Sequence, residues 1–296
     1  MNVVECEKVT KKQGSVVALN ELNIQIKKNT ITGLIGRNGA GKTTLLKILA
    51  GLWRPTSGHV EVLSVNPFNS LTVSANVAYI DDSMDFPNTL TLSEILQAGK
   101  RFYGNWDSQL AERLFEYFSF HPNQLHTHLS KGKASTFNMI FGLAARCEIT
   151  LFDEPTNGMD ASVRKDFNRA LLKDYLAHPR TMIISSHHLE ELEELLEDIL
   201  VIKNGKELLH EPIDVIRNYA IGLTGRSELV RQWVTDKQVL YTEEVGANTC
   251  YAVVKSEGIP LEKAKQLGMK VTPVSASDVC VYLTNRTTGG IDDVFK

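Results

Sequence analysis

Four residues near the start of the chain have the types and the spacing of a phosphate-binding loop. Gly36, Gly41, Lys42 and Thr43 match the pattern G-x-x-x-x-G-K-[ST] within the segment GRNGAGKTT. In such a loop, backbone N–H groups and the following helix N-terminus hold phosphate, the lysine reaches the β- and γ-phosphates, and the hydroxyl binds Mg²⁺. An ordinary glycine-rich turn is the alternative, which the flanking strand and helix patterns disfavour. The residues predicted to line this nucleotide site are Gly36, Arg37, Asn38, Gly39, Ala40, Gly41, Lys42, Thr43 and Thr44.

Two adjacent carboxylates follow an apolar run in the middle of the chain. The run from Ile149 to Phe152 leads directly into Asp153 and Glu154. A carboxylate at the end of a strand beside a phosphate loop can hold Mg²⁺, and the next one can act as general base toward the attacking water. We therefore predict Asp153 as a metal ligand and Glu154 as the catalytic base. Taken alone, the pair would be an acidic turn that ends a strand.

Short apolar runs must position these groups. Residues 31–35 read as a buried strand, and apolar residues within 45–49 recur at helical spacing before Gly51. A third run, 182–184, precedes the segment SSH, so His187 lies at the C-terminal end of a strand. Open α/β sheets bind their ligands at that end, which places His187 in the same predicted site rather than among structural histidines.

Length and composition bound the remaining functions. The 296 residues suffice for two domains, and 43% hydrophobic with 23% charged residues are typical of a globular protein. A formal charge of -3 gives no electrostatic reason to expect a nucleic-acid partner. The four cysteines are scattered, as expected for reduced thiols. The first residues have no apolar signal core and no run approaches the length of a membrane span, so a task at a membrane would need another chain.

Together, five segments resemble the ATP-binding subunit of an ABC transporter, and in particular the ABC-2 type exporter group. GRNGAGKT resembles the Walker A loop, ITLFDE the Walker B strand, LSKGK the signature, NGMD the D-loop and SSH the switch-histidine segment. The resemblance implies an α/β P-loop NTPase cassette over residues 1–218, with a RecA-like core and a helical lobe at about 86–146. It also implies an ATPase that uses ATP and Mg²⁺, with Glu154 and His187 as catalytic residues.

The resemblance further implies protein partners. Two cassettes pair head to tail, as a homodimer or a heterodimer, and sandwich each ATP between one Walker A loop and the partner's signature. Ser130, Gly132 and Asp160 are the residues implied on the signature and D-loop side. Closing and reopening the pair drives a separate transmembrane permease, which implies a place at the cytoplasmic face of the membrane. The implied cargo of such an exporter is a peptide, a drug or a lipid-like molecule.

Some positions depart from the family pattern. Asp82 stands where the family has a glutamine, and its carboxylate is a further candidate Mg²⁺ ligand. Lys131 and Lys133 replace a glycine and a glutamine of the signature, and Gln13 stands where an aromatic residue usually stacks on adenine. These departures leave open a catalytically weak regulatory cassette in a heterodimer. A soluble ABC protein of translation or DNA repair fits less well, because the chain has one uninterrupted cassette and no basic patch.

The last part of the chain, residues 219–296, has a different pattern. Its strand-like and helix-like segments follow the order β-α-β-β-α-β, which predicts a small ferredoxin-like α+β domain. Tails of this kind resemble dimerisation or regulatory domains, with a passive stabilising appendage as the alternative. Upstream, the leucines of HLEELEELLED recur on one face of a predicted amphipathic helix.

Overall fold

The computed structural model describes residues 1–187 and 189–284 and forms two compact units. The units comprise Met1–His187 with Glu194–Leu209, and His188–Glu193 with His210–Lys296. The predicted cassette boundary at residue 218 lies inside the second unit, because helix α7 (Ile213–Arg217) packs on helix α10 (Ala276–Thr284). Residues 285–296 of the predicted C-terminal domain lie outside the described residues.

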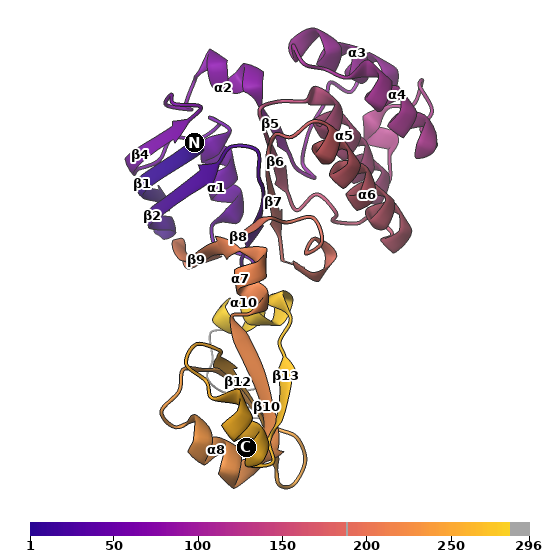
Figure 1. Ribbon diagram of the computed structural model, residues 1–296. Helices are drawn as coiled ribbons and strands as arrows, with labels where there is room; N and C mark the ends of the chain where they lie inside the picture. Colours follow the sequence, from indigo (N-terminus) through magenta and orange to yellow (C-terminus); the bar gives the residue numbers. More distant parts are fainter. Residues whose placement is uncertain (188, 285–296) are drawn as a thin grey trace. The chain divides into compact units, whose positions relative to one another are not determined.

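A largely parallel sheet of six strands forms the centre of the first unit (Figure 1). In spatial order its strands are β5 (Val77–Ile80), β6 (Ile149–Asp153), β7 (Thr181–Ser186), β3 (Ile31–Ile35), β8 (Asp198–Lys203) and β9 (Lys206–Pro212). β3 pairs in parallel with β7 and β8, and β6 with β5 and β7. Every residue of β3, β6 and β7 is buried, as expected for a parallel sheet covered on both faces. The C-terminal ends of these strands therefore meet at one edge of the sheet.

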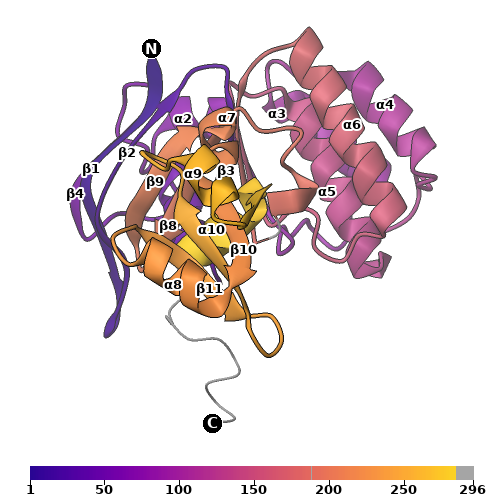
Figure 2. The ribbon, with the colours of Figure 1, turned by 60° about the horizontal axis from the view of Figure 1, so that its bottom comes forward.

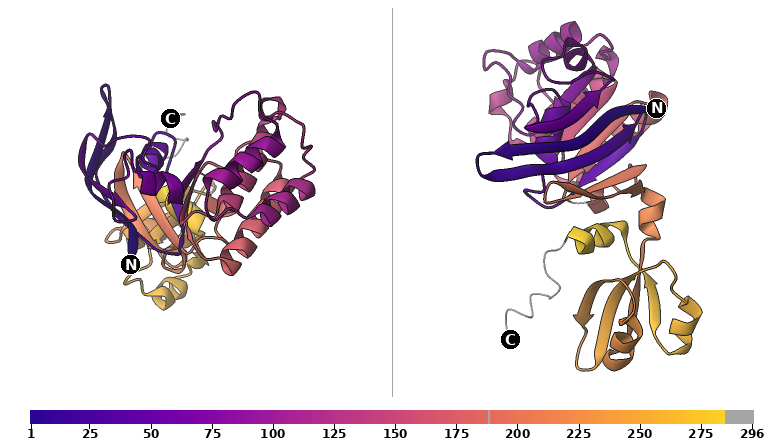
Figure 3. Two further views of the ribbon diagram at one scale, coloured as in Figure 1. Left: turned by 90° about the horizontal axis from the view of Figure 1, so that it is seen from above. Right: turned by 90° about the vertical axis from the view of Figure 1, so that its left-hand side faces the viewer.

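A second, antiparallel sheet lies on the other side of helix α1 (Lys42–Leu49) from the central sheet (Figure 3). Its strands, in the order β2-β1-β4, are β2 (Val16–Lys27), β1 (Asn2–Gln13) and β4 (Ser57–Val62). Inward-facing residues of β1, β2 and β4 form one hydrophobic core with Leu45, Leu46, Ile48 and Leu49 of α1. The core holds α1, and so the loop before it, rigidly between the two sheets.

Helices complete the first unit, and most of them lie on the opposite side of the central sheet from α1 (Figure 1). They are α2 (Leu71–Asn76), α3 (Leu92–Phe102), α4 (Ser108–Tyr117), the 3-10 helix η1 (His126–His128), α5 (Lys131–Ala145) and α6 (Ala161–Ala177). α5 packs on β5 and α6, while α3 and α4 pack on α5. Every residue of α5 from Ser135 onward is buried, and aromatic rings such as Phe86 and Trp106 pack edge-on against Phe141. α5 therefore joins the helical lobe to the sheet.

The second unit contains an antiparallel sheet with two helices packed on one face (Figure 2). Its elements after α7 are β10 (Ala220–Arg226), α8 (Ser227–Val234), β11 (Val239–Glu244), β12 (Thr249–Lys255), α9 (Leu261–Gln266), β13 (Lys270–Pro273) and α10. The strand order β11-β12-β10-β13 is that of a ferredoxin-like domain, and Val230 of α8 and Ala264 of α9 share one core with Leu223 of β10. The predicted ferredoxin-like α+β arrangement is confirmed.

Two further findings concern the segments between these elements. In the described residues 189–197, the leucine-rich segment predicted as a helix forms a 3-10 helix, η2 (Leu189–Glu191), followed by turns before β8. Across residues 1–187 and 189–284, no helix is long and apolar enough to cross a bilayer.

Candidate active site

The phosphate-loop segment connects β3 to α1 at the C-terminal edge of the central sheet. Gly41 has φ +112°, and a Cβ there would collide with the carbonyl oxygen of Ala18. A Cβ on Gly36 would meet the carbonyl oxygen of Ile202. Only glycine fits these two positions. Gly41 is also the N-cap of α1, and since glycine has no side-chain oxygen, the first N–H groups of the helix are left to bind an anion.

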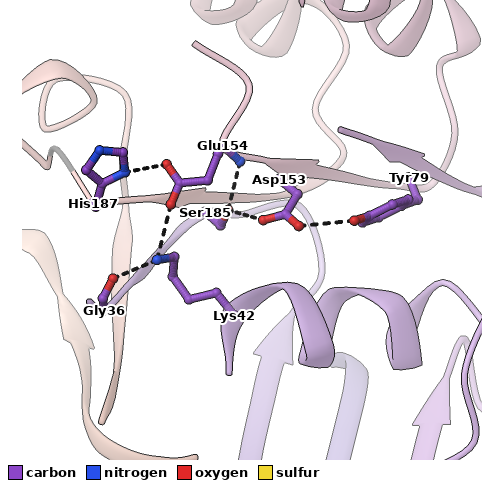
Figure 4. A network of polar contacts seen from close by, with 7 residues as sticks. All are labelled: Gly36, Lys42, Tyr79, Asp153, Glu154, Ser185 and His187. Atoms are coloured by element: carbon purple, nitrogen blue, oxygen red, sulfur yellow. Dashed lines mark hydrogen bonds and ion pairs between the residues drawn. The ribbon is translucent and has the colours of Figure 1, made fainter. Parts of the chain in front are cut away.

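Lys42 is the first residue of α1, and its ammonium group lies between Gly36 of the loop and Glu154 (Figure 4). Its Nζ donates to the carbonyl oxygen of Gly36 at 2.6 Å and lies 3.1 Å from Oε1 of Glu154. The Lys42 side chain is only 6% exposed. Such a buried charge needs paired partners, which the loop carbonyl and the carboxylate supply.

Asp153 ends β6 and is held by the strands on either side of it. Its Oδ1 accepts a hydrogen bond from Ser185 of β7 at 2.6 Å, and its Oδ2 accepts one from Tyr79 of β5 at 3.0 Å (Figure 4). Burial, followed by the negative charges of Asp153 and Asp81, raises the pKa of Tyr79 far above its ordinary value. The Tyr79 hydroxyl therefore stays protonated and acts as the donor.

Glu154 follows β6 in an unusual backbone conformation. Its φ is +49°, in the left-handed region that residues other than glycine rarely adopt. Its N–H donates to Oγ of Ser185 at 2.9 Å, and its Oε2 lies 2.7 Å from Nδ1 of His187, just after β7. The structure thus brings together Lys42, Glu154 and His187, as the sequence analysis expected.

A second group of predicted residues lies around the start of α5. Ser130 is the N-cap of α5, and a Cβ on Gly132 would collide with the carbonyl oxygen of Gly158 in the NGMD segment. Asp160, the N-cap of α6, ends that segment and is exposed. The predicted signature and D-loop are therefore packed against each other.

Asp82, predicted from the sequence as a candidate Mg²⁺ ligand, forms an ion pair with a lysine. Its Oδ2 lies 3.1 Å from Nζ of Lys131, the residue that replaces the signature glycine. Both side chains are partly exposed, at 40% for Asp82 and 67% for Lys131. Two departures from the family pattern are thus paired with each other, and the network around Asp153 is built from other residues (Figure 4).

Sequence reasoning missed two residues of the site, Tyr79 and Ser185. Ser185 had a usable signal, because a polar residue at the end of a buried strand lies at the ligand-binding edge of an α/β sheet. Tyr79 had none, since an aromatic residue in an apolar strand is ordinary core. Their contribution depends on which strands are neighbours in the sheet.

The arrangement fits a nucleotide bound with Mg²⁺. Gly36 and Gly41 keep the loop (the glycine cradle) free of side-chain atoms that other residues would place there. Lys42 supplies a full positive charge. Thr43, exposed in the first turn of α1, and Asp153 offer the oxygen ligands that Mg²⁺ prefers. In the described part of the chain, no cluster of three His, Cys, Asp or Glu residues could hold a metal by itself. A Mg²⁺ ion here would therefore complete its shell with phosphate oxygens and water, as is usual for this ion.

Comparisons with known proteins agree with this geometry. The family described as ABC transporter matches residues 19–157. The bacitracin transport ATP-binding protein BcrA of Bacillus licheniformis is 31% identical over 218 residues, which cover 73% of this chain and 71% of the relative. The ABC transporter ATP-binding protein YtrB of Bacillus subtilis is 27% identical over 197 residues, covering 67% of this chain and 68% of the relative.

Solved structures share the fold. An ATP-binding subunit of an ABC transporter superposes with a TM-score of 0.65 at 22% identity, covering 73% of this chain and 92% of that one. A dimeric ATP-binding cassette in a post-hydrolysis state, with ADP and Pi bound, gives a TM-score of 0.63 at 22% identity, covering 71% and 98%. These likenesses confirm the predicted P-loop cassette fold. The sequence likeness to BcrA over most of both chains shows that this chain belongs to the ABC transporter family, as an ATP-binding subunit and an ATPase.

Proposed function

We propose that this chain is the ATP-driven motor of an exporter. In this proposal it binds ATP with Mg²⁺, pairs with a second cassette and drives a separate transmembrane permease at the cytoplasmic face of the membrane. The observation that carries the proposal is the intact network of Lys42, Glu154 and His187 around a glycine cradle. The name of the similar protein BcrA, a bacitracin transport ATP-binding protein, supports a role in transport, and the cargo we propose is peptide-like, drug-like or lipid-like.

The proposed roles follow from the contacts of each residue. Backbone N–H groups from Gly36 to Thr44 and the Lys42 ammonium hold the phosphates, so Lys42 must exchange its bond with Glu154 for one with phosphate. Thr43 and Asp153 would hold Mg²⁺, which when bound offsets the charge of the phosphates. Once released by Lys42, the Glu154 carboxylate can take a proton from the attacking water. His187, 2.7 Å from the other Glu154 oxygen, keeps that carboxylate oriented.

The signature side is proposed to act on the nucleotide of the second cassette. Ser130 opens α5, whose N-terminal N–H groups favour an anion, and Gly132 lets the NGMD segment approach closely. Asp160 lies at the end of that same segment. The C-terminal unit is proposed to serve as an accessory or dimerisation domain.

One experiment separates the motor from a catalytically weak regulatory cassette. The purified chain is assayed for ATP turnover alone, with its copurified membrane subunits, and with any second cassette found among them. Turnover that requires Glu154 of this chain supports the motor. Turnover that persists in a complex carrying Glu154→Gln would assign the motor to the other cassette and this chain to regulation.

A further inference from the structure

We propose that Ser185 and Tyr79 are positioning residues of the ATPase site. Their hydroxyls hold the Asp153 carboxylate in one orientation, and Ser185 also holds the backbone of Glu154. The inference rests on the proposed function, in which Asp153 is a ligand of Mg²⁺. It adds two residues that act on the metal and on the attacking water through Asp153 and Glu154.

The Asp153 carboxylate is fixed from both sides. In the sheet, β6 lies between β5 and β7, and Asp153 is directly in register with Ser185. Ser185 donates to Oδ1 at 2.6 Å and Tyr79 donates to Oδ2 at 3.0 Å, so rotating the carboxylate would break two hydrogen bonds. Each carboxylate oxygen has two lone pairs and keeps one for a metal ion or its water. The ligand is therefore oriented before the metal binds.

Ser185 links the two carboxylate residues through one hydroxyl group. It donates its proton to Asp153 and accepts the N–H of Glu154 at 2.9 Å. Glu154 has φ +49°, which is disfavoured for a residue with a side chain, so its backbone needs a fixed partner to keep this conformation. Ser185 is fully buried and cannot exchange this role with water. One hydroxyl thus sets the positions of both the metal ligand and the base.

Tyr79 acts on the Asp153 side chain, and the Asp81 carboxylate also lies near its hydroxyl. Its hydroxyl contacts Oδ2 of Asp153. The centroid of its ring lies 6.0 Å from Nζ of Lys47, a residue of α1. Replacing Tyr79 with Phe removes the donor and keeps the ring. The variants of Ser185 and Tyr79 should therefore differ in their kinetics. A purely structural role for the two hydroxyls does not predict such a difference.

The chain offers a matched control for each variant. Thr181 lies at the other end of β7, is buried, and its hydroxyl accepts the N–H of Asn29 at 3.0 Å. Thr181→Val therefore removes a buried hydroxyl acceptor from the same strand. Tyr117 donates to Asp166 at 2.9 Å on the surface, so Tyr117→Phe removes a tyrosine–carboxylate hydrogen bond outside the site.

The test measures ADP binding by calorimetry over a range of Mg²⁺ concentrations, Mn²⁺ binding by electron paramagnetic resonance, and ATP turnover. Loss of a residue that orients a metal ligand typically costs 10- to 100-fold in metal affinity. We expect Ser185→Ala to weaken Mn²⁺ binding by this factor, to leave metal-free ADP affinity unchanged, and to lower kcat even at saturating Mg²⁺. We expect Tyr79→Phe to raise the Mg²⁺ concentration at half-saturation and to lower kcat at saturating Mg²⁺ by less than Ser185→Ala does. Both controls should keep the wild-type Mg²⁺ dependence.

Two outcomes would overturn the inference. One is a wild-type Mg²⁺ dependence in both Ser185→Ala and Tyr79→Phe, and the other is an equal shift in Thr181→Val. If Ser185→Ala fails to fold, Tyr79→Phe decides, because it preserves the packing of the ring. A wild-type chain that binds no ADP with Mg²⁺ would instead overturn the proposed function, so the two failures are distinguishable.

Discussion

Lys42 and Glu154 form an ion pair with 3.1 Å between Nζ and Oε1, inside a site where the lysine is 6% exposed and the glutamate 20%. The residue that should hold phosphate thus neutralises the residue that should activate water. Nucleotide must compete with Glu154 for Lys42. Under the proposed function, Glu154 would become available as the base only after phosphate has taken Lys42, which would couple catalysis to occupancy of the loop.

Glu154→Gln should bind nucleotide more tightly and hydrolyse ATP far more slowly. A positioned general base contributes about 10²- to 10⁴-fold to the rate, and the neutral amide competes less well for Lys42 than a carboxylate does. ADP affinity is measured by calorimetry. Because ADP is not hydrolysed, its affinity reports the weaker competition for Lys42 separately from the loss of the base. Glu148→Gln, which neutralises an exposed partner of Lys28, is the control. Unchanged ADP affinity in Glu154→Gln would mean that the ion pair does not oppose nucleotide binding.

The same variant should accumulate as an ATP-bound dimer. Slow hydrolysis keeps ATP at the proposed interface between two cassettes, so the dimer has time to build up. Light scattering of Glu154→Gln with ATP and Mg²⁺ checks this expectation, with ADP as the comparison. A monomer in both nucleotides would contradict head-to-tail pairing of identical chains and leave a heterodimer.

Lys42→Ala should weaken ATP binding by about 10- to 100-fold, since hydrogen bonds to charged groups contribute about 1.5–3 kcal/mol. The loop loses its buried ammonium group, and the Glu154 carboxylate keeps its contact with His187 but loses its lysine partner beside the phosphates. Calorimetric titration with ATP measures the change, and Lys28→Ala, outside the site, is the matched control. An affinity equal to that of the wild type would argue against the site.

Asp82→Gln tests two readings of the same residue. Because Lys131 already pairs with its carboxylate, we expect the variant to keep the Mg²⁺ dependence of ADP binding. We also expect a coupling of under about 1 kcal/mol between Asp82 and Lys131 in a double-mutant cycle, as is usual for exposed pairs. A weaker Mg²⁺ dependence, with tighter metal-free binding of ADP, would instead place Asp82 at the metal, as predicted from the sequence.

Asp174→Asn should destabilise the first unit. Asp174 is buried in α6 and pairs with Arg146 and Arg180, each at 2.8 Å. Removing the shared carboxylate leaves the buried Arg180 guanidinium without the Asp174 charge, while Arg146 keeps its ion pair with Asp107. Breaking such a buried pair costs about 3–5 kcal/mol of unfolding free energy. Denaturant unfolding measures this loss, and Asp166→Asn, at a partly exposed position, should change the free energy by under about 1 kcal/mol.

The buried cysteines should make stability fall at high pH. Burial raises the pKa of Cys6, Cys147 and Cys280 to about 12, against 9.0 for the free thiol. Between these values the unfolded chain ionises while the folded chain does not, so stability present below pH 9 is lost as pH rises toward 12. A thiol reagent at pH 8 should label the native chain slowly and the urea-unfolded chain at all four cysteines. Rapid native labelling would contradict the buried positions.

The sequence by itself determined the parts of this protein whose physics is local. The phosphate loop follows from glycines that the backbone requires at Gly36 and Gly41, with Lys42 next in the chain. Asp153 and Glu154 follow a short apolar run that reads as a buried strand, and the order β-α-β-β-α-β of the C-terminal unit follows from periodicity. Each of these features depends on residues that are close together in the chain, so their types and spacing are enough to predict it.

Periodicity was misleading where it reported burial and not conformation. Leu189, Leu192, Leu195 and Leu196 are all buried, as the pattern indicates. The predicted helix is wrong, because the segment forms η2 and then turns toward β8. Leu196 packs directly against Gly33 of β3, a contact that depends on the path of the chain back to the sheet.

Only the tertiary structure decided which hydroxyl groups hold the Asp153 carboxylate. Tyr79 is 74 positions from Asp153 and Ser185 is 32 positions from it, yet both contact its oxygens. The pairing of Asp82 with Lys131 likewise joins the end of β5 to the start of α5. The reason is that strand order in a sheet is set by non-local packing. Spacing along the chain shows where a strand ends, and only the fold shows which strands end beside it.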